Sequence, residues 1–299
     1  MTIKPLTFID LFAGCGGLSL GFEQSGFKGV LAIDFWQDAL TTYSYNREHS
    51  KTLCGDLSAI SPDDVKNEFK ISDVDVIIGG PPCQGFSVAG KRIIDDKRNE
   101  LYKSFVNFVR VFRPKAFVME NVPTILTMGN GIIRDAILSD FTDLGYTINY
   151  KVITASDYGV PQNRRRAVFV GLLGGEIYNF PTPSIDKHIS SYEALSDLPE
   201  NSQQDGSSYI CEPMSEFQRL MRKYSRGVYN HNITIHTART QEIIAMVPDG
   251  GNYKDLPKEL WDTRKVHIAW TRLNSKRPSF TIDCGHNHHF HYKFNRVPT

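Results

Sequence analysis

Short apolar runs alternate with amphipathic stretches through residues 6–173 of the chain. Runs such as Val76-Ile77-Ile78 are rich in β-branched residues, which is typical of strands buried on both faces. The pattern predicts strands at 6–12, 29–33, 75–78, 116–119, 146–154 and 167–173, and helices at 18–25, 37–46, 99–112 and 132–144. Because strands and helices alternate, we expect an α/β fold with a doubly wound, mainly parallel sheet.

The pattern changes after Phe180, where Pro181-Thr182-Pro183 opens a polar region with scattered aromatic residues. Only short elements are predicted there, namely helices at 190–198, 215–224 and 237–247 and a strand at 278–282. We therefore predict two domains, residues 1–180 and a second, smaller and irregular domain at residues 181–299.

Composition narrows the class of protein without identifying it. With 299 residues, 40% of them hydrophobic and 22% charged, the chain resembles an ordinary globular enzyme. No apolar run approaches the ~20 residues of a membrane span, and no export signal precedes the first predicted strand. The five cysteines are scattered and lack C-x-x-C spacing. We expect a cytoplasmic protein with no membrane partner. The net charge of +1 does not indicate a polyanionic partner, so a nucleic-acid surface would need local clusters of basic residues.

The loop Gly79-Gly80-Pro81-Pro82-Cys83 mounts a cysteine directly after the apolar run 75–78. Each proline restricts φ and removes an N–H donor, while the glycines permit close approach of a substrate. Ligands of open α/β sheets bind beyond the carboxyl ends of the strands, so Cys83 is predicted to be a reactive thiolate. The alternative is a Pro/Gly turn that carries an incidental cysteine.

A glycine-rich turn, Ala13–Gly17, follows the first predicted strand. It differs from the dinucleotide fingerprint G-x-G-x-x-G, because a serine stands where that motif needs its third glycine. Acidic residues stand at or beyond the ends of neighbouring apolar runs: Asp10, Asp34 and Asp56. Asp34 lies twenty residues after Gly14, a spacing at which a carboxylate can accept hydrogen bonds from ribose hydroxyls. S-adenosyl-L-methionine, which joins adenosine to a cationic amino acid, fits these acids better than a nicotinamide cofactor does.

Four motifs follow one another along the chain: Phe8–Gly17, Gly80–Gln84, Glu120–Val122 and Gln162–Arg166. In this order they resemble the motifs of the cytosine-C5 DNA methyltransferases of bacterial restriction-modification systems. Co-linear motifs are far more specific than any one of them. The resemblance implies a Rossmann-like S-adenosyl-L-methionine-dependent methyltransferase. In this interpretation the first domain binds the cofactor and catalyses the reaction, and the second is an incomplete target-recognition domain.

The resemblance also implies a role for individual residues. The catalytic residues of this chain would be Cys83, Glu120, Arg164 and Arg166. Asp34 would hold the ribose, Phe35 the adenine ring, Asp56 the adenine amino group and Leu101 the cofactor's other face. The whole cofactor pocket would comprise Asp10, Phe12, Ala13, Gly14, Cys15, Gly16, Gly17, Asp34, Phe35, Asp56, Leu57, Pro81 and Leu101. Contacts to substrate DNA would come from Gln84, Ser87, Lys91, Arg92 and Arg98, and no metal is expected.

The implied chemistry is methyl transfer to C5 of a cytosine flipped out of a specific duplex DNA sequence. A thiolate that adds at C6 makes C5 nucleophilic, and Arg164 or Arg166 could supply the positive charge that favours the thiolate of Cys83. Arg166 would hold the cytosine O2. Glu120 must carry a proton to donate to N3, which a pocket closed to water favours. We therefore expect the loop 86–99 to close over the site during the reaction.

Several alternatives stay open. The last two motifs of the family are missing, so we expect either a fragment or a second polypeptide that completes the enzyme, with weak or no activity of this chain alone. A tRNA cytosine-C5 methyltransferase is less favoured because its Cys-Phe-Thr element is absent, and a DNA-binding subunit without turnover is the other class. A restriction endonuclease is the expected partner in such a system. The histidine-rich segment His286–His291 could bind zinc, but a DNA-facing polar loop is favoured.

Overall fold

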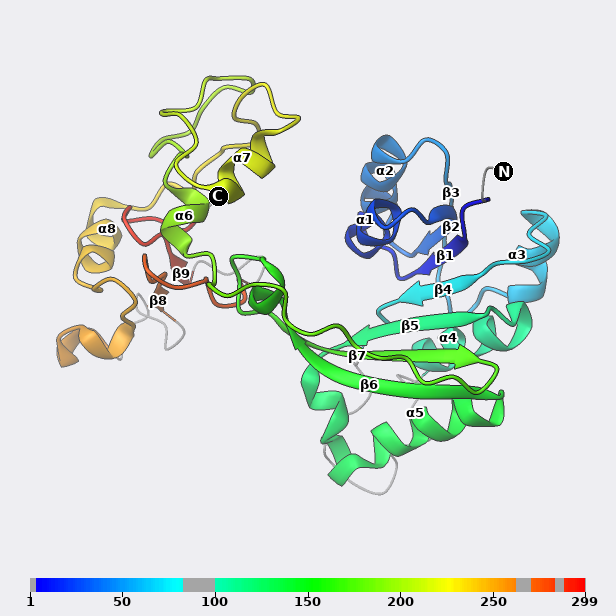
Figure 1. The fold of residues 1–299 in the computed structure, drawn as a ribbon. Coiled ribbons are helices and arrows are strands. Elements are labelled where there is room, and N and C mark those ends of the chain that lie inside the picture. The colour runs from blue at the N-terminus through cyan, green and yellow to red at the C-terminus, as the bar shows by residue number, and fades with distance from the viewer. Residues whose placement is uncertain (1–3, 83–99, 262–269, 283–287, 299) are drawn as a thin grey trace. The chain divides into compact units, whose positions relative to one another are not determined.

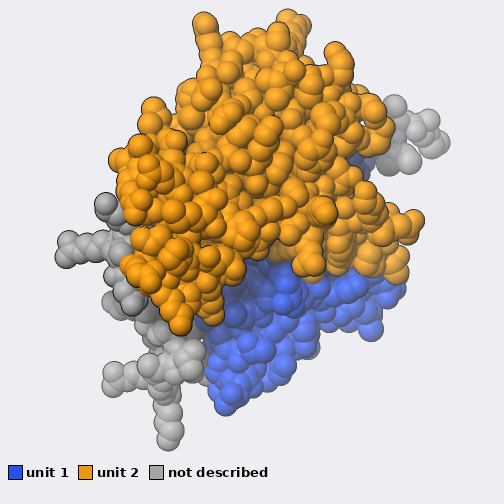
Figure 2. Space-filling model, turned by 90° about the vertical axis from the view of Figure 1, so that its left-hand side faces the viewer, with its two compact units in different colours: residues 1–153, 165–181 blue, residues 154–164, 182–299 orange. Residues whose placement is uncertain are grey.

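A computed structural model describes residues 4–82, 100–261, 270–282 and 288–298. It divides into two compact units, coloured separately in Figure 2: unit 1 is Met1–Ile153 with Arg165–Pro181, and unit 2 is Thr154–Arg164 with Thr182–Thr299. The chain thus leaves unit 1 at residue 154, returns at residue 165 and leaves again at residue 182. The sequence pattern did not predict that residues 154–164 group with unit 2.

Unit 1 is built on one seven-stranded sheet of order β3-β2-β1-β4-β5-β7-β6 (Figure 1). The pairs β1–β2, β1–β4, β2–β3 and β4–β5 are parallel, and β5–β7 is antiparallel. The strands are β1 (Thr7–Leu11), β2 (Lys28–Asp34), β3 (Lys51–Cys54), β4 (Val76–Gly79), β5 (Ala116–Asn121), β6 (Tyr146–Thr154) and β7 (Arg165–Leu173).

Helices cover both faces of this sheet. One face packs on α3 (Pro62–Glu68), α4 (Glu100–Phe112) and α5 (Ile132–Asp143), and the other on α1 (Gly17–Gln24) and α2 (Gln37–Asn46). Successive strand residues divide between the two layers: Ile77 lies in the α3–α5 core, whereas Val76 and Ile78 lie in the α1 cluster. This arrangement confirms the predicted doubly wound, mainly parallel α/β fold.

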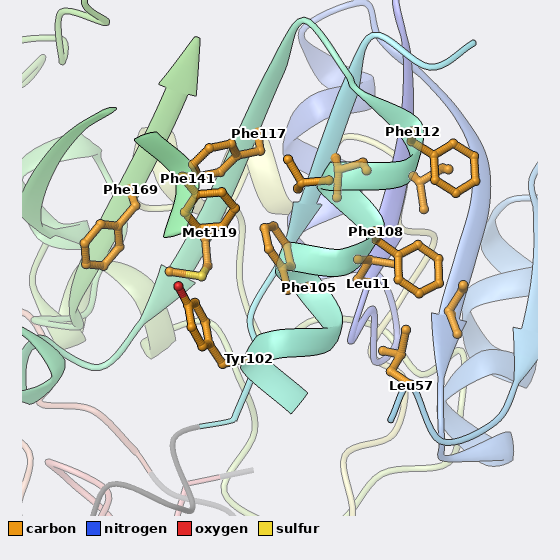
Figure 3. Packing of buried hydrophobic residues seen from close by; sticks show 14 of the residues in the cluster. Leu11, Leu57, Tyr102, Phe105, Phe108, Phe112, Phe117, Met119, Phe141 and Phe169 are labelled. Atoms are coloured by element: carbon orange, nitrogen blue, oxygen red, sulfur yellow. The ribbon is translucent and has the colours of Figure 1, made fainter. Parts of the chain in front are cut away.

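The larger core is dominated by aromatic side chains (Figure 3). Phe117 on β5 stacks on Phe141 of α5, with ring centroids 4.0 Å apart, and meets Phe105 of α4 edge-on at 6.2 Å. All three side chains are fully buried. Because Phe117 pairs with Gly171 on β7, its ring lies over a position that has no side chain. This packing anchors α4 and α5 to the strands whose ends carry Pro81, Glu120 and Arg166.

Unit 2 is held together differently, by a small apolar cluster and a buried arginine. Its elements are α6 (Ser191–Leu195), α7 (Glu216–Arg222), α8 (Ala238–Ala245) and the short parallel pair β8 (Thr271–Arg272) and β9 (His289–Phe290). The guanidinium of Arg272, 4% exposed, donates to the carbonyls of Val247, Ile244 and His291. Hydrogen bonds from a charged donor are stronger than neutral ones, so Arg272 ties these three segments together.

Some predicted elements were wrong or missing. The predicted strand 278–282 is reduced to one bridge between Ser279 and Gln162. The helix α3 and the 3-10 turns η2 (Pro123–Leu126), η3 (Met128–Gly131) and η4 (Ala155–Tyr158) were not predicted. The sequence did carry a signal for α3, because the Ser61 side chain caps it and Pro62 occupies its first turn. Across the described ranges, no helix combines the length and apolar character needed to cross a membrane.

The contact between Phe117 and Gly171 gives a stability prediction. A Cβ added at Gly171 would lie 2.0 Å from Cε1 of Phe117, so Gly171→Ala should destabilise the fold by about 1–3 kcal/mol in urea unfolding. Adding Phe117→Leu should reduce the cost of the alanine. The matched control is Gly21→Ala in α1, where nothing lies within 4 Å of the added Cβ and which should not destabilise. Equal stability of the two alanine variants would contradict this packing.

Candidate active site

The candidate site lies where several strands of unit 1 end. Parallel pairing aligns Leu11 with Ile33 and Gly79, and Asp34 with Cys54. Parallel strands that pair in register have their carboxyl ends at one edge of the sheet, where open α/β folds bind ligands. The segments that follow β1, β2, β3, β4 and β5 therefore meet at this edge, and they contain most of the predicted site residues.

The glycine-rich turn after β1 has an unusual backbone. Phe12 has a positive φ of 60°, which is uncommon for a residue other than glycine. Gly14 and Gly16 have φ of 53° and 88°. A Cβ at Gly16 would lie 2.6 Å from the Arg47 guanidinium and 2.7 Å from the Tyr43 ring, so only glycine fits there. Left-handed backbone at a non-glycine residue is held against a local energy cost and clusters at functional sites.

Asp34 joins the first turn to the second. One of its carboxylate oxygens accepts from the backbone N–H of Gly14 at 2.8 Å, and the other accepts from the N–H of Trp36 at 2.9 Å. The side chain of the next residue, Phe35, is 76% exposed. A fixed carboxylate beside an exposed aromatic ring can accept from hydroxyl groups and stack on a planar base.

Asp56 extends this arrangement from the end of β3. Its Oδ1 accepts from the backbone N–H and the hydroxyl of Ser58 at 2.9 and 2.7 Å. These hydrogen bonds, the backbone one first, hold the pKa of the Asp56 carboxyl below its usual range, so the group is anionic at neutral pH. The N–H of Gly55 donates to the carbonyl of Asp34 at 2.9 Å, which ties the two acidic loops together. The acceptors suit a ligand with ribose hydroxyls and an amino group.

Three predicted cofactor residues are buried in ways that the sequence did not indicate. Asp10 is 1% exposed, and its carboxylate accepts from the Ser19 hydroxyl at 2.6 Å. Its contact with the cofactor stays a prediction. Burial raises the pKa of Asp10 to about 7, although the Ser19 hydrogen bond opposes the rise. The side chains of Leu57 and Ala13 are 3% and 8% exposed and pack in the cores, which leaves their backbone atoms for a ligand.

A charged pair stands at the ends of β5 and β7. Glu120 Oε1 forms a salt bridge with Nε of Arg166, and both side chains are partly buried. The antiparallel register pairs Glu120 with Val168, so Arg166 is the diagonal neighbour on the same face. A Cβ at Gly80 would lie 3.0 Å from Glu120 Oε2. The loop after β4 therefore passes directly against this carboxylate.

Asn121 fixes that loop from the next position. Its side-chain amide donates to the carbonyl of Pro81 at 2.9 Å, and both residues are buried. Leu101 is half-buried against the core at the start of α4. The structure thus brings together Glu120, Arg166 and the loop that precedes Cys83.

Other predicted residues cannot be placed at this site. Cys83, Gln84, Ser87, Lys91, Arg92 and Arg98 lie outside the described residues, as does the loop 86–99 that was expected to close. Arg164 belongs to unit 2, whereas Glu120 and Arg166 belong to unit 1.

The histidine-rich segment is in part structural. His291 is 3% exposed, and its Nδ1 accepts from the N–H groups of Lys293 and Phe294 at 3.0 and 3.1 Å. Burial, reinforced by Arg296 and Arg272, lowers the pKa of His291 to about 3. The expectation of a DNA-facing loop is therefore wrong for His291, while His286 and Asn287 lie outside the described residues. Within the described part of the chain, no three potential metal ligands cluster.

Comparison with known proteins decides the family. The family model of the C-5 cytosine-specific DNA methylases matches residues 6–283. The chain belongs to this family. Within it, the chain is 41% identical over 268 residues to the type II methyltransferase M.DdeI of Desulfomicrobium norvegicum, covering 85% of this chain and 64% of that protein. It is 36% identical over 297 residues to M1.HphI of Haemophilus parahaemolyticus, covering 98% and 75%. The chain thus spans about two thirds to three quarters of these relatives.

A solved structure supports the same assignment. The crystal structure of a protein described as a DNA modification methyltransferase encoded within a prophage of E. coli superimposes with a TM-score of 0.76 at 28% identity. The alignment covers 98% of this chain and 85% of that one. The predicted family and α/β fold are both confirmed.

Buried Asp10 gives a pH prediction. In the unfolded chain the Asp10 carboxyl loses its proton near pH 4, whereas in the native state it keeps the proton until about pH 7. The free energy of unfolding therefore falls as pH rises between these values. Relative to Asp10→Asn, the wild type should lose about 2–3 kcal/mol of unfolding free energy between pH 5 and pH 8, at ~1.4 kcal/mol per pH unit. Urea unfolding at both pH values measures it, with the exposed Asp38→Asn as control. Parallel pH profiles of wild type and Asp10→Asn would show that burial does not perturb this carboxyl.

Proposed function

We propose that the chain transfers a methyl group from S-adenosyl-L-methionine to C5 of a cytosine flipped out of a specific duplex DNA sequence, through a covalent Cys83 intermediate. One observation carries the proposal beyond family membership: Glu120 and Arg166 form a pair that lies against the loop leading to Cys83. In this role the protein would protect DNA within a restriction-modification system, as the type II relatives suggest.

The cofactor half of the proposal rests on the loops after β1, β2 and β3. Asp34 keeps free lone pairs for the ribose hydroxyls, Phe35 offers a face to the adenine ring, and Asp56 has a second oxygen for the adenine amino group. When bound, the cofactor would supply an electrophilic methyl group on a sulfonium, whose sulfur would keep the electrons of the broken C–S bond and leave as the thioether S-adenosyl-L-homocysteine. The turn after β1 and the backbone near Pro81 and Leu101 would enclose the rest of the molecule.

Activation of the flipped cytosine needs a nucleophile, a proton donor and a cation. The Cys83 sulfur adds to C6, electrons move into the ring, and C5 becomes able to attack a methyl group. Glu120, when protonated, donates to N3 and stabilises the electron-rich ring, while Arg166 donates to O2. After transfer, a base removes the C5 proton and the C6–S bond breaks, which restores the aromatic ring and the free thiolate.

Before a base enters the site, Glu120 and Arg166 are joined by their salt bridge. A cytosine that binds between them offers O2 to Arg166 and N3 to Glu120, so it replaces the ion pair with two separate contacts. Glu120 then faces N3, to which it donates when protonated. The same contacts select cytosine over thymine, whose N3 already carries a hydrogen and cannot accept.

Other predicted partners stay predictions. A second polypeptide and a restriction endonuclease are not tested by the structure. The tRNA methyltransferase and the subunit without turnover remain the competing functions, and the substrate and adduct tests below distinguish them.

A covalent trap tests the nucleophile. Incubation with S-adenosyl-L-methionine and duplex DNA carrying 5-fluorocytosine should give a stable protein–DNA adduct, because fluorine at C5 blocks the elimination step. The adduct, detected by denaturing electrophoresis, should vanish in Cys83→Ala and persist in the control Cys211→Ala. Binding without an adduct would favour the non-catalytic subunit, and an adduct on tRNA alone would favour the RNA enzyme.

The paired carboxylate gives a second prediction. Glu120→Gln keeps the shape but cannot supply a titratable proton, so kcat should fall by about 10²-fold or more, while the KM for S-adenosyl-L-methionine stays within a factor of about three. The matched control is Glu68→Gln on α3, an exposed residue that should leave both constants unchanged. A Glu120→Gln variant with normal kcat would remove Glu120 from the mechanism.

A further inference from the structure

Two side chains of α2 support the glycine-rich turn from behind, and neither was among the predicted site residues. Tyr43 is fully buried and Arg47, at the C-terminal end of the helix, is 5% exposed. The guanidinium carbon of Arg47 lies 4.8 Å from the centre of the Tyr43 ring. The two residues therefore form one packed unit beneath the turn.

Arg47 holds the carbonyl groups of the turn. Its Nη2 donates to the carbonyl of Gly16 at 2.8 Å, and its Nη1 donates to the carbonyl of Cys15 at 3.5 Å. Its Nε donates to Glu23 of α1 at 2.9 Å, which supplies the compensating negative charge. A planar guanidinium can bind a carboxylate and two carbonyls at once, which the single ammonium of a lysine cannot reproduce.

Tyr43 connects the same helix to the start of α1. Its hydroxyl shares a hydrogen bond of 2.9 Å with the Ser19 hydroxyl, and Ser19 in turn donates to Asp10 at 2.6 Å. All three side chains are at most 1% exposed. This chain fixes the end of β1 and the first turn of α1, between which the glycine-rich turn lies.

The helix α2 lies next to residues of the candidate site, so the contacts of Tyr43 and Arg47 affect ligand binding as well as the stability of the fold. The helix begins two residues after Phe35, and Asp34 accepts from the Gly14 N–H. The turn is thus held by Asp34 on one side and by Arg47 on the other. A displacement of α2 would move the aromatic residue, the acid and the turn together.

We propose that Arg47 and Tyr43 are positioning residues that set the affinity for the adenosine-containing cofactor by fixing the backbone of residues 13–17 against Asp34. The proposal rests on the proposed function, because it assigns this edge of the sheet to that cofactor. A purely structural role would lower stability without a selective effect on cofactor binding.

Calorimetric titration of the full chain with S-adenosyl-L-homocysteine tests this without requiring turnover. Arg47→Lys keeps a charge for Glu23 but loses the carbonyl contacts, and we expect Kd to rise about ten-fold, or about 1.4 kcal/mol. Tyr43→Phe removes one hydroxyl and should raise Kd about three-fold. This change corresponds to the free energy that a single neutral hydrogen bond contributes. Where steady-state rates are measured, KM for S-adenosyl-L-methionine should rise while KM for DNA stays constant.

The matched control is Arg222→Lys in unit 2. Arg222 is a partly buried arginine, 13% exposed, that binds Asp197 and the carbonyl of Cys211, so its loss should also lower the Tm. Its Kd for S-adenosyl-L-homocysteine should be that of the wild type. Should Arg47→Lys fail to fold, Tyr43→Phe decides, because the smaller change keeps the packing.

The outcomes separate this inference from the proposed function. A wild-type chain that does not bind S-adenosyl-L-homocysteine would overturn both. Normal binding by the wild type together with control-like Kd values in Arg47→Lys and Tyr43→Phe would overturn the positioning role and leave the proposed function intact.

Discussion

The parallel pairing of β1 with β2 and β4 is the constraint on which the rest of this structure depends. It brings Leu11, Ile33 and Gly79 into register, so the segments that follow these strands begin at one edge of the sheet. The glycine-rich turn, the Asp34 loop and the loop before Cys83 then need only short connections to meet. The antiparallel strand β7 adds Arg166 to the same arrangement, because its register with β5 places Arg166 diagonally from Glu120.

Hydrogen bonds between loops give this edge its geometry. Asp34 accepts from Gly14, Asn121 donates to Pro81, and Gly55 donates back to Asp34. Each bond joins segments that are distant in sequence. Loops tied together by such hydrogen bonds lose less entropy when a ligand binds.

The sequence predicted the parts of the fold that follow from local patterns. Continuous apolar runs such as Val76–Ile78 identified buried strands, and the helix at 37–46 matches α2 at both ends. The four motifs identified the family and the pair Glu120 and Arg166. The pattern could not supply side-chain direction. Asp10 lies near the end of β1, yet its carboxylate is buried and accepts from Ser19 of α1, whose hydroxyl in turn shares a hydrogen bond with Tyr43 of α2. Arg47 was missed for a related reason, since a lone arginine at a helix end gives no signal of the carbonyls that it will meet. The grouping of residues 154–164 with unit 2 likewise depends on contacts with distant segments.

We propose that this edge of the sheet directs a methyl group to a ring carbon through a sulfur nucleophile. The most direct test is mass spectrometry of nucleosides from duplex DNA after incubation with the chain and S-adenosyl-L-methionine. We expect 5-methyl-2′-deoxycytidine with the wild-type chain and none when Cys83 is replaced by alanine. Methylation on an exocyclic amino group, or a C5 product that survives the loss of Cys83, would contradict it.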